Sequence, residues 1–133
     1  MANLPLKFDS PLEEAFYHAF RNGRLRDWFE PETHQQNRKT AFIEPQYRVG
    51  RYRVDFLIGL QIPPYEQVNC VVEIDGHDWH ERTKEQAQRD KSRDRALLQS
   101  GFPVIRFTGS EVYKDADECA YEAYLALRCR SDG

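Results

Sequence analysis

The sequence has few cysteines, no long apolar run and no low-complexity segment. Its cysteines are far apart and form no CxxC pair, which argues against a disulfide framework and against a cysteine-bound zinc site; they are Cys70, Cys119 and Cys129. No stretch approaches the roughly eighteen apolar residues of a membrane span, and the first ten residues lack the pattern of a signal peptide. The sequence therefore predicts a cytoplasmic protein with no membrane association.

The composition indicates a folded and highly charged domain. Hydrophobic residues make up 40% of the chain and aromatic residues 13%, which is too apolar for a disordered protein although 31% of the residues are charged. A chain of 133 residues is near the common size of one domain and can bury a single core without disulfides. We expect one domain over residues 1–133.

The net charge of -3 hides an uneven distribution along the chain. Residues 21–53 carry eight basic and four acidic side chains, and residues 82–95 carry six and three. Between them, residues 54–81 hold six acidic side chains and no lysine or arginine. A basic rim around an acidic centre suits a site that cleaves phosphodiesters, because the rim neutralises phosphates while carboxylates hold a divalent cation. An ordinary solvated surface is the alternative explanation.

The N-terminal third predicts a helix followed by a loop. Ser10, Pro11 and Glu13 form a capping box with proline at the first helical position, so a helix should run from residue 10 to about residue 22. Its buried stripe should contain the apolar residues at helical spacing: Leu12, Ala15, Phe16 and Ala19. Residues 24–41 show no sustained period and predict a loop with a turn or two of helix.

The rest of the chain predicts an α/β fold. Strands are expected at residues 42–49, 52–60, 68–75 and 104–107, and helices at residues 81–100 and about 115–129. The tight turn at Gly50 and Arg51 makes the first two strands a hairpin, and Pro45 places the first strand near a sheet edge. The fold class is therefore α/β, with a small mixed central sheet flanked by helices.

Acidic residues fall on two predicted neighbouring strands. Side chains alternate across a strand, so Asp55 shares a face with Arg53, and Glu73 shares a face with Asp75. If the strands pair, Asp55 and Glu73 project to the same side, and carboxylates so close raise one another's pKa unless a cation intervenes. Mg²⁺ is the expected cation, because it prefers carboxylate and water oxygens, lowers the pKa of a bound water and stabilises charge on a phosphate.

Each of these residues also has an ordinary structural explanation. Asp55 can be paired with Arg53, because an unpaired buried carboxylate costs several kcal/mol. Glu73 and Asp75 can be charges at a strand end. Glu13 can be only the reciprocal residue of the capping box.

Five stretches, in order along the chain, carry a family resemblance. They are SPLE at residues 10–13, YRVDF at 52–56, EIDGHDWH at 73–80, RDKSRD at 89–94 and GFPVIRF at 101–107. Asp55 in YRVDF, with Glu73 and Asp75 in EID as further catalytic candidates, resembles the split acidic motif of the PD-(D/E)XK nuclease superfamily. The restriction-endonuclease-like core of that superfamily has the order αβββαβ. All five together resemble the small bacterial DUF559-type proteins, which are similar to the very short patch repair endonucleases. The likeness covers about residues 10–112.

The resemblance implies a metal-dependent DNA endonuclease that uses Mg²⁺, for which Mn²⁺ can substitute. Asp55 would be the central metal ligand and Glu73 the second, joined by the backbone carbonyl of Ile74. His80 would act in proton transfer, and Glu13 would hold a water at the metal.

The sequence departs from these family patterns in two ways. Asp75 replaces the usual lysine, so the lysine's role in activating water would pass to His80, Lys84 or Gln88. The structural zinc ligands of the repair enzymes have no counterpart, so mismatch repair is not supported. The alternatives to an enzyme are a catalytically inactive nuclease-fold domain that binds nucleic acid and, in a third class, a structural or partner-binding domain.

Basic residues of the helix at 81–100 are the candidates for holding DNA. Spacings of three, four and seven residues place Lys84, Gln88, Lys91 and Arg95 along one side. Lys84 and Lys91 are expected to contact phosphates without reading bases, since lysine acts there as a point charge. Basic residues of the hairpin turn are a second set of candidates: Arg48, Arg51 and Arg53. In the same helix, Asp90 and Arg93 can simply tie the helix to the sheet. The sequence leaves the oligomeric state open, with a homodimer as one option.

Overall fold

The computed structural model describes residues 8–29, 39–76 and 83–132 and confirms the predicted α/β class. The elements follow in the order α1 (Pro11–Asn22), the short 3-10 helix η1 (Arg26–Phe29), β1 (Thr40–Val49), β2 (Tyr52–Gln61), β3 (Val68–Asp75), α2 (Lys84–Gln99), β4 (Val104–Thr108), α3 (Gly109–Lys114) and α4 (Ala116–Asp132). No helix in these ranges is long and apolar enough to cross a membrane.

The four strands form one mixed sheet in the order β1-β2-β3-β4. β1, β2 and β3 pair antiparallel, whereas β3 and β4 pair parallel, with Ile74 opposite Phe107. A parallel pair needs a crossover connection, and the segment containing α2 provides it. The β1–β2 hairpin turns at Gly50, whose φ of +59° favours glycine. β1 is an edge strand, as Pro45 predicted.

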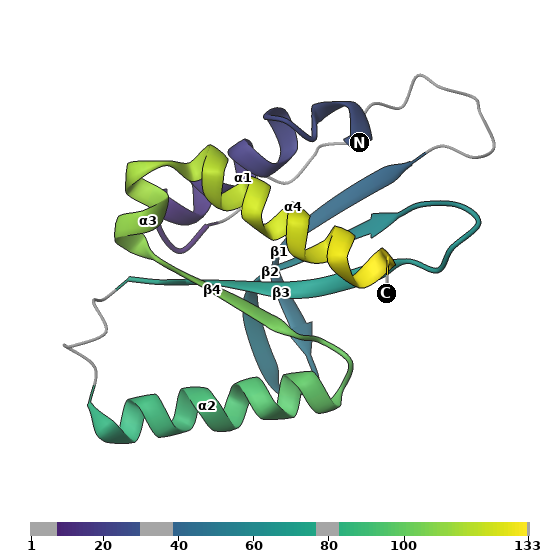
Figure 1. The fold of residues 1–133 in the computed structure, drawn as a ribbon. Helices are drawn as coiled ribbons and strands as arrows, with labels where there is room; N and C mark the ends of the chain where they lie inside the picture. The colour runs from purple at the N-terminus through teal and green to yellow at the C-terminus, as the bar shows by residue number, and fades with distance from the viewer. Residues whose placement is uncertain (1–7, 30–38, 77–82, 133) are drawn as a thin grey trace, which may run out of the picture.

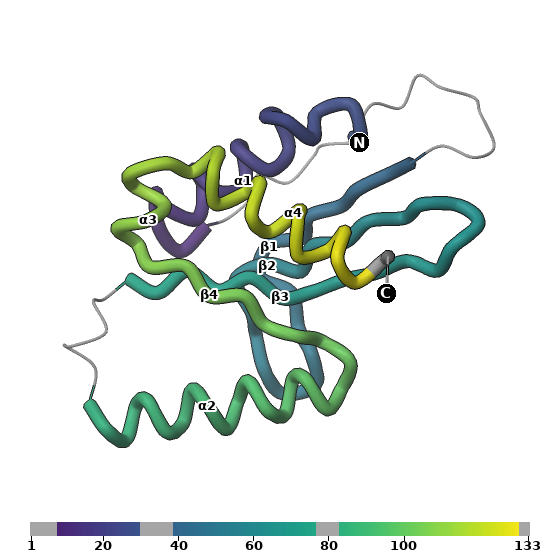
Figure 2. The backbone as a smooth tube through the Cα atoms, in the orientation of Figure 1, coloured from purple at the N-terminus to yellow at the C-terminus, as the bar shows by residue number. Residues whose placement is uncertain are grey.

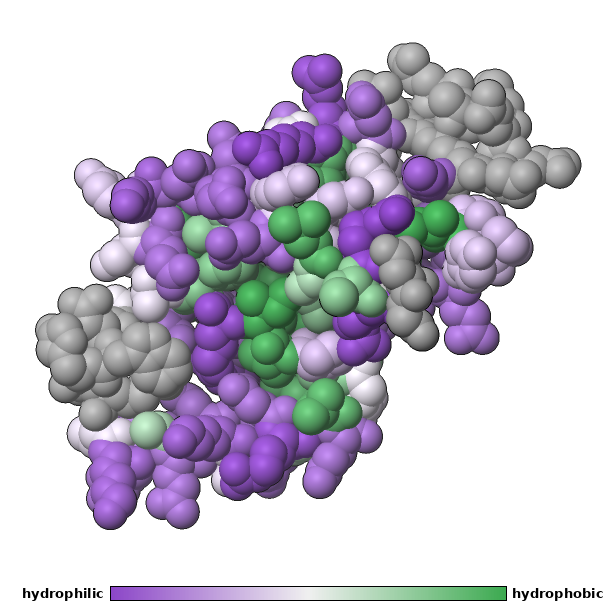
Figure 3. All heavy atoms as spheres, in the orientation of Figure 1, coloured by the Kyte–Doolittle hydropathy of each residue, from purple (hydrophilic) through white to green (hydrophobic). Residues whose placement is uncertain are grey.

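Helices cover the two faces of the sheet unequally. α1, α3 and α4 lie on one face and enclose the main core, while α2 lies alone on the other face (Figures 1 and 2). A second, smaller core lies under α2 and consists of Val54, Leu57, Val71 and Leu97. Hydrophilic residues dominate the visible surface of α2, at the lower edge of Figure 3. α2 is therefore held to the sheet by a small apolar contact, to which polar contacts are added.

α1 buries a different stripe from the predicted one. Phe16 is fully buried as expected, but Ala15 is exposed, and the large rings of Tyr17 and Phe20 are buried instead. The aromatic rings have more apolar area to remove from water than the methyl group of Ala15, so the helix turns them toward the core. This rotation also buries Glu13, for which the sequence had left open a role as a helix cap alone.

The C-terminal region contains two helices where one was predicted. Thr108 and Glu111 form a capping box that begins α3: the Thr108 hydroxyl accepts from the backbone N–H of Glu111, and the Glu111 carboxylate accepts from that of Thr108. Asp115 then accepts from the N–H of Glu118 at 3.0 Å in the first turn of α4. The predicted helix start at residue 115 was therefore one residue early, α3 was missed, and α4 runs on to Asp132.

The buried contact under α2 can be tested with two adjacent leucines. Leu97 is 1% exposed in the smaller core and Leu98 is 60% exposed. Leu97→Ala should lower the free energy of unfolding by about 2–5 kcal/mol, because it leaves a cavity under the helix. Leu98→Ala should change that free energy by no more than about 0.5 kcal/mol. Urea denaturation measures both, and equal effects of the two substitutions would show that α2 does not pack as described.

Candidate active site

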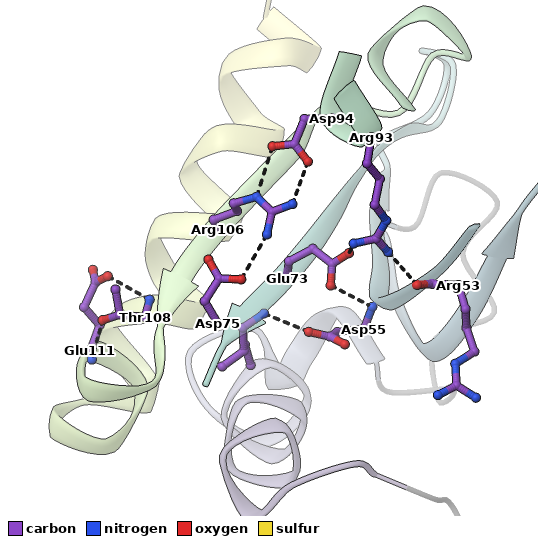
Figure 4. Close-up of polar contacts among 10 residues, drawn as sticks. Arg53, Asp55, Glu73, Asp75, Arg93, Asp94, Arg106, Thr108 and Glu111 are labelled. Atoms are coloured by element: carbon purple, nitrogen blue, oxygen red, sulfur yellow. Dashed lines mark hydrogen bonds and ion pairs between the residues drawn. The ribbon is translucent and has the colours of Figure 1, made fainter. Parts of the chain in front are cut away.

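Asp55 and Glu73 meet where β2 and β3 stop pairing. The last paired residues of the two strands are Phe56 and Val72. Beyond them, the N–H of Asp55 donates to Oε2 of Glu73 at 3.3 Å, and the N–H of Ile74 donates to Oδ2 of Asp55 at 2.9 Å (Figure 4). Side-chain carboxylates therefore replace the backbone hydrogen bonds of the strand ladder at this point, and Asp55 and Glu73 are joined through these contacts.

Glu73 is a buried carboxylate with a cation against it. Its side chain is 6% exposed, and Nη1 of Arg93 lies 2.6 Å from its Oε1. Burial raises the pKa of Glu73 and the nearby Asp55 carboxylate raises it further, while Arg93 and Arg106 oppose the shift. Arg93 also donates to the backbone carbonyl of Arg53. Arg93 thus connects α2 to the sheet, as its place in the predicted helix had suggested. The connection is made at the acidic site.

Glu13 reaches the same site from α1. Its backbone N–H donates to the hydroxyl of its N-cap Ser10, and its carboxylate accepts from Ser10 and, at 2.9 Å, from the side-chain amide of Gln46. Burial raises the pKa of Glu13 to about 7, with smaller contributions from the neighbouring Asp55 and Asp9 carboxylates. The carboxylate of Glu13 therefore lies beside Asp55, and helix capping does not account for it.

Asp9, Glu13 and Asp55 form a cluster of possible metal ligands. One oxygen from each lies within 4.8 Å of the other two. Asp9 is exposed and also pairs with Arg53, with Nη2 and Oδ2 3.2 Å apart. The sequence left Arg53 open as a partner of Asp55, and the structure places it against Asp9 instead. All three donors are carboxylate oxygens, which is the chemistry that a hard divalent cation prefers.

Asp75 lies in a second ionic group beside the first. Nη1 of Arg106 is 2.9 Å from Oδ1 of Asp75, and the same guanidinium donates two hydrogen bonds to Asp94 on α2, at 3.0 and 2.7 Å. Arg106 is 13% exposed. This guanidinium, bidentate toward Asp94, connects β3, β4 and α2 and holds Asp75 in place.

An open pocket of about 1200 Å³ lies between α2 and the sheet, next to these acids. Its lining consists of Arg51, Tyr52, Asp55, Glu73, Ile74, Asp75, Gly76, Glu85, Gln86, Gln88, Arg89, Asp90, Ser92, Arg93 and Arg106. Of the predicted DNA-binding residues, the lining includes Gln88 and Arg51. Lys84 and Lys91 are exposed on α2 outside the lining.

The structure brings together most of the residues proposed from sequence, and it adds others. His77 and His80 belong to residues 77–82, which lie outside the described part of the chain. Asp9, Gln46 and Arg106 were not proposed as site residues. Asp9 immediately precedes the helix N-cap, a position where an acid is ordinary. Gln46 has a φ of 54° in an edge strand, and no pattern in the sequence signals that its amide faces Glu13.

Comparison with known proteins gives one match. The family model REase_MTES_1575, which describes restriction endonuclease-like proteins, matches residues 29–127. The matched segment contains Asp55, Glu73 and Asp75 and all of α2. No curated protein and no solved structure matches the chain.

The buried carboxyl of Glu13 predicts a dependence of stability on pH. Because its pKa is raised to about 7, its contribution to stability is fully present below the ordinary glutamate pKa of 4.5 and is lost as the pH rises through 7. In EDTA, wild type should therefore lose stability relative to Glu13→Gln between pH 5 and about pH 8. Thermal unfolding across this range measures the difference. The matched control is Glu44→Gln, at an exposed position of β1, whose curve should run parallel to that of wild type. A Glu13→Gln curve parallel to wild type would contradict the assignment.

Proposed function

Since this chain belongs to the REase_MTES_1575 family of restriction endonuclease-like proteins, we propose that it is a metal-dependent DNA endonuclease that hydrolyses phosphodiester bonds. The observation that carries the proposal is the cluster of Asp9, Glu13 and Asp55 carboxylates, of which Asp55 lines an open pocket together with Glu73. The N–H of Asp55 donates to Glu73, and burial raises the pKa values of Glu13 and Glu73, as expected of carboxylates at a cation-binding site.

The donor set fits Mg²⁺, with Mn²⁺ as a substitute. Asp55 would hold the ion together with Glu13 and Asp9, whose oxygens are within 4.8 Å of one another, and Glu73 would join as the second acid of the motif. The backbone carbonyl of Ile74 stays a proposed further ligand. When bound, the ion would lower the pKa of a water molecule that acts as the nucleophile, and it would stabilise negative charge on the phosphate.

The protein's own groups would position the substrate and move protons. His80 stays our proposal for proton transfer. Asp75 is paired with Arg106, so we assign it a positioning role: it fixes the end of β3 against β4 and, through Asp94, against α2. Positive charge near the phosphate would come from the arginines of the pocket lining, foremost Arg51 and Arg89.

The alternative is a nuclease-fold domain that binds nucleic acid without cutting it. One observation favours it: in the described part of the chain the pocket lining contains arginines but no lysine, and Asp75 stands where the superfamily has one. This alternative predicts salt-sensitive DNA binding with no cleavage in any metal.

Cleavage assays distinguish the two. Wild type incubated with plasmid or single-stranded DNA should cleave in Mg²⁺ or Mn²⁺ and not in EDTA. Asp55→Asn keeps an oxygen that can accept from the N–H of Ile74 but loses a charge of the metal site, so activity should fall by about a hundredfold or more. The matched control is Asp117→Asn, at an exposed position of α4, which should cleave like wild type. Cleavage in EDTA, or undiminished cleavage by Asp55→Asn, would remove the endonuclease assignment. His80→Ala tests the proton-transfer role in the same assay.

Two pairs of basic residues test how DNA is held. We propose that Lys84 and Lys91 contact flanking phosphates, and that Arg51 and Arg89 contact phosphates inside the pocket. Replacing either pair with glutamine should weaken binding to all sequences alike and lower the salt slope by about 0.9 for each duplex phosphate that the protein no longer neutralises. The arginine pair should also slow cleavage. Unchanged affinity of the folded lysine variant would show that this side of α2 is only solvated.

A further inference from the structure

Arg93 occupies an unusual position for a pocket arginine. Its guanidinium lies between the buried acid Glu73, 2.6 Å away, and the backbone carbonyl of Arg53 (Figure 4). It also lies 5.8 Å from the ring centroid of Tyr52. The side chain is 23% exposed and contributes to the pocket lining. Arg93 thus contacts the acidic site and is accessible from the space that a substrate would enter.

Both carboxylate oxygens of Glu73 are engaged. Oε1 is in the ion pair with Arg93, and Oε2 accepts from the N–H of Asp55. A divalent cation bound to Oε1 would be in direct contact with the guanidinium, and two positive charges at that distance repel one another. Glu73 can therefore serve either Arg93 or a cation through this oxygen, but not both.

The neighbouring arginine is held more firmly. Arg106 is bound by two carboxylates, one of them bidentate, and is 13% exposed. Arg93, within the ranges that the structure describes, contacts one carboxylate and one carbonyl, and its side chain is more exposed. Arg106 therefore has more carboxylate partners than Arg93 in the described part of the chain, and it is less exposed.

We propose that Arg93 is a movable counter-ion that links cation binding to DNA binding. It neutralises Glu73 in the DNA-free protein, and it contacts a DNA phosphate once Glu73 binds the cation. This inference rests on the proposed nuclease function. It accounts for a buried acid that is stable without metal, and it provides a cation next to the reacting phosphate in a chain whose motif lacks the lysine.

Mn²⁺ binding to the full chain without DNA gives the first test, with free Mn²⁺ measured by electron paramagnetic resonance. Arg93→Gln removes the competing charge and should tighten Mn²⁺ binding by about tenfold. Arg93→Lys keeps the charge and should stay near wild type. The matched control is Arg89→Gln, which alters another pocket arginine of α2 and should have a much smaller effect. Unchanged or weaker Mn²⁺ binding by Arg93→Gln would overturn the proposal.

DNA binding in EDTA gives a second test that needs no change at Arg93. Glu73→Gln should release Arg93, so it should bind a short duplex more tightly and with a salt slope steeper by about one unit. Glu85→Gln removes a different acid from the pocket lining and controls for the simple loss of negative charge. Equal effects of the two substitutions would overturn the proposal.

The outcomes separate this inference from the proposed function. Wild type that neither binds Mn²⁺ nor cleaves DNA in metal would remove both. Wild type that binds Mn²⁺ and cleaves, with Mn²⁺ affinity that does not respond to Arg93→Gln, would remove only the role of Arg93.

Discussion

The hydrogen bond from the N–H of Ile74 to Oδ2 of Asp55, 2.9 Å long, is the contact on which the site depends. It forms where β2 and β3 diverge, so a carboxylate satisfies a backbone group that the strand ladder leaves without a partner. The reciprocal contact, from the N–H of Asp55 to Glu73, orients the second acid. The acids are therefore fixed by the sheet itself, and a substitution that loosens the strand ends would disturb the site before it disturbed the core.

Burying several carboxylates in one place is costly unless positive charge accompanies them. The protein supplies that charge in two ways. Arg106, held by Asp75 and Asp94, is a permanent part of the fold. Arg93, held by Glu73 and accessible from the pocket, is the part that we expect to move. Arg93 joins α2 to Glu73, and Arg106 of β4 joins Asp75 to Asp94 of α2. These ion pairs, together with the small core at Leu97, connect α2 to the strands that carry the acids.

The sequence predicted the elements that depend on regular patterns. The expectation that Asp55 and Glu73 come close together on adjacent strands agrees with the hydrogen bond between them, and Pro45 marked the edge strand correctly. It could not show that Gln46 turns toward Glu13 or that Asp9 joins the acids, because these contacts join segments from different layers and follow from the final packing. For the same reason the sequence predicted only that Arg93 connects the helix to the sheet. Helical spacing shows which residues lie on the same face of a helix, but it does not show that Arg93 pairs with the buried Glu73.

In the proposed site, Asp55 anchors a divalent cation at the junction of α1, β2 and β3. The most direct measurement is an anomalous difference map, recorded near the manganese absorption edge, from crystals of the protein grown with Mn²⁺ and a phosphorothioate DNA that resists cleavage. A peak is expected within coordination distance of the Asp55 carboxylate, which is about 2.0–2.1 Å for Mg²⁺. A map with DNA in the pocket and no manganese peak at Asp55 would contradict it.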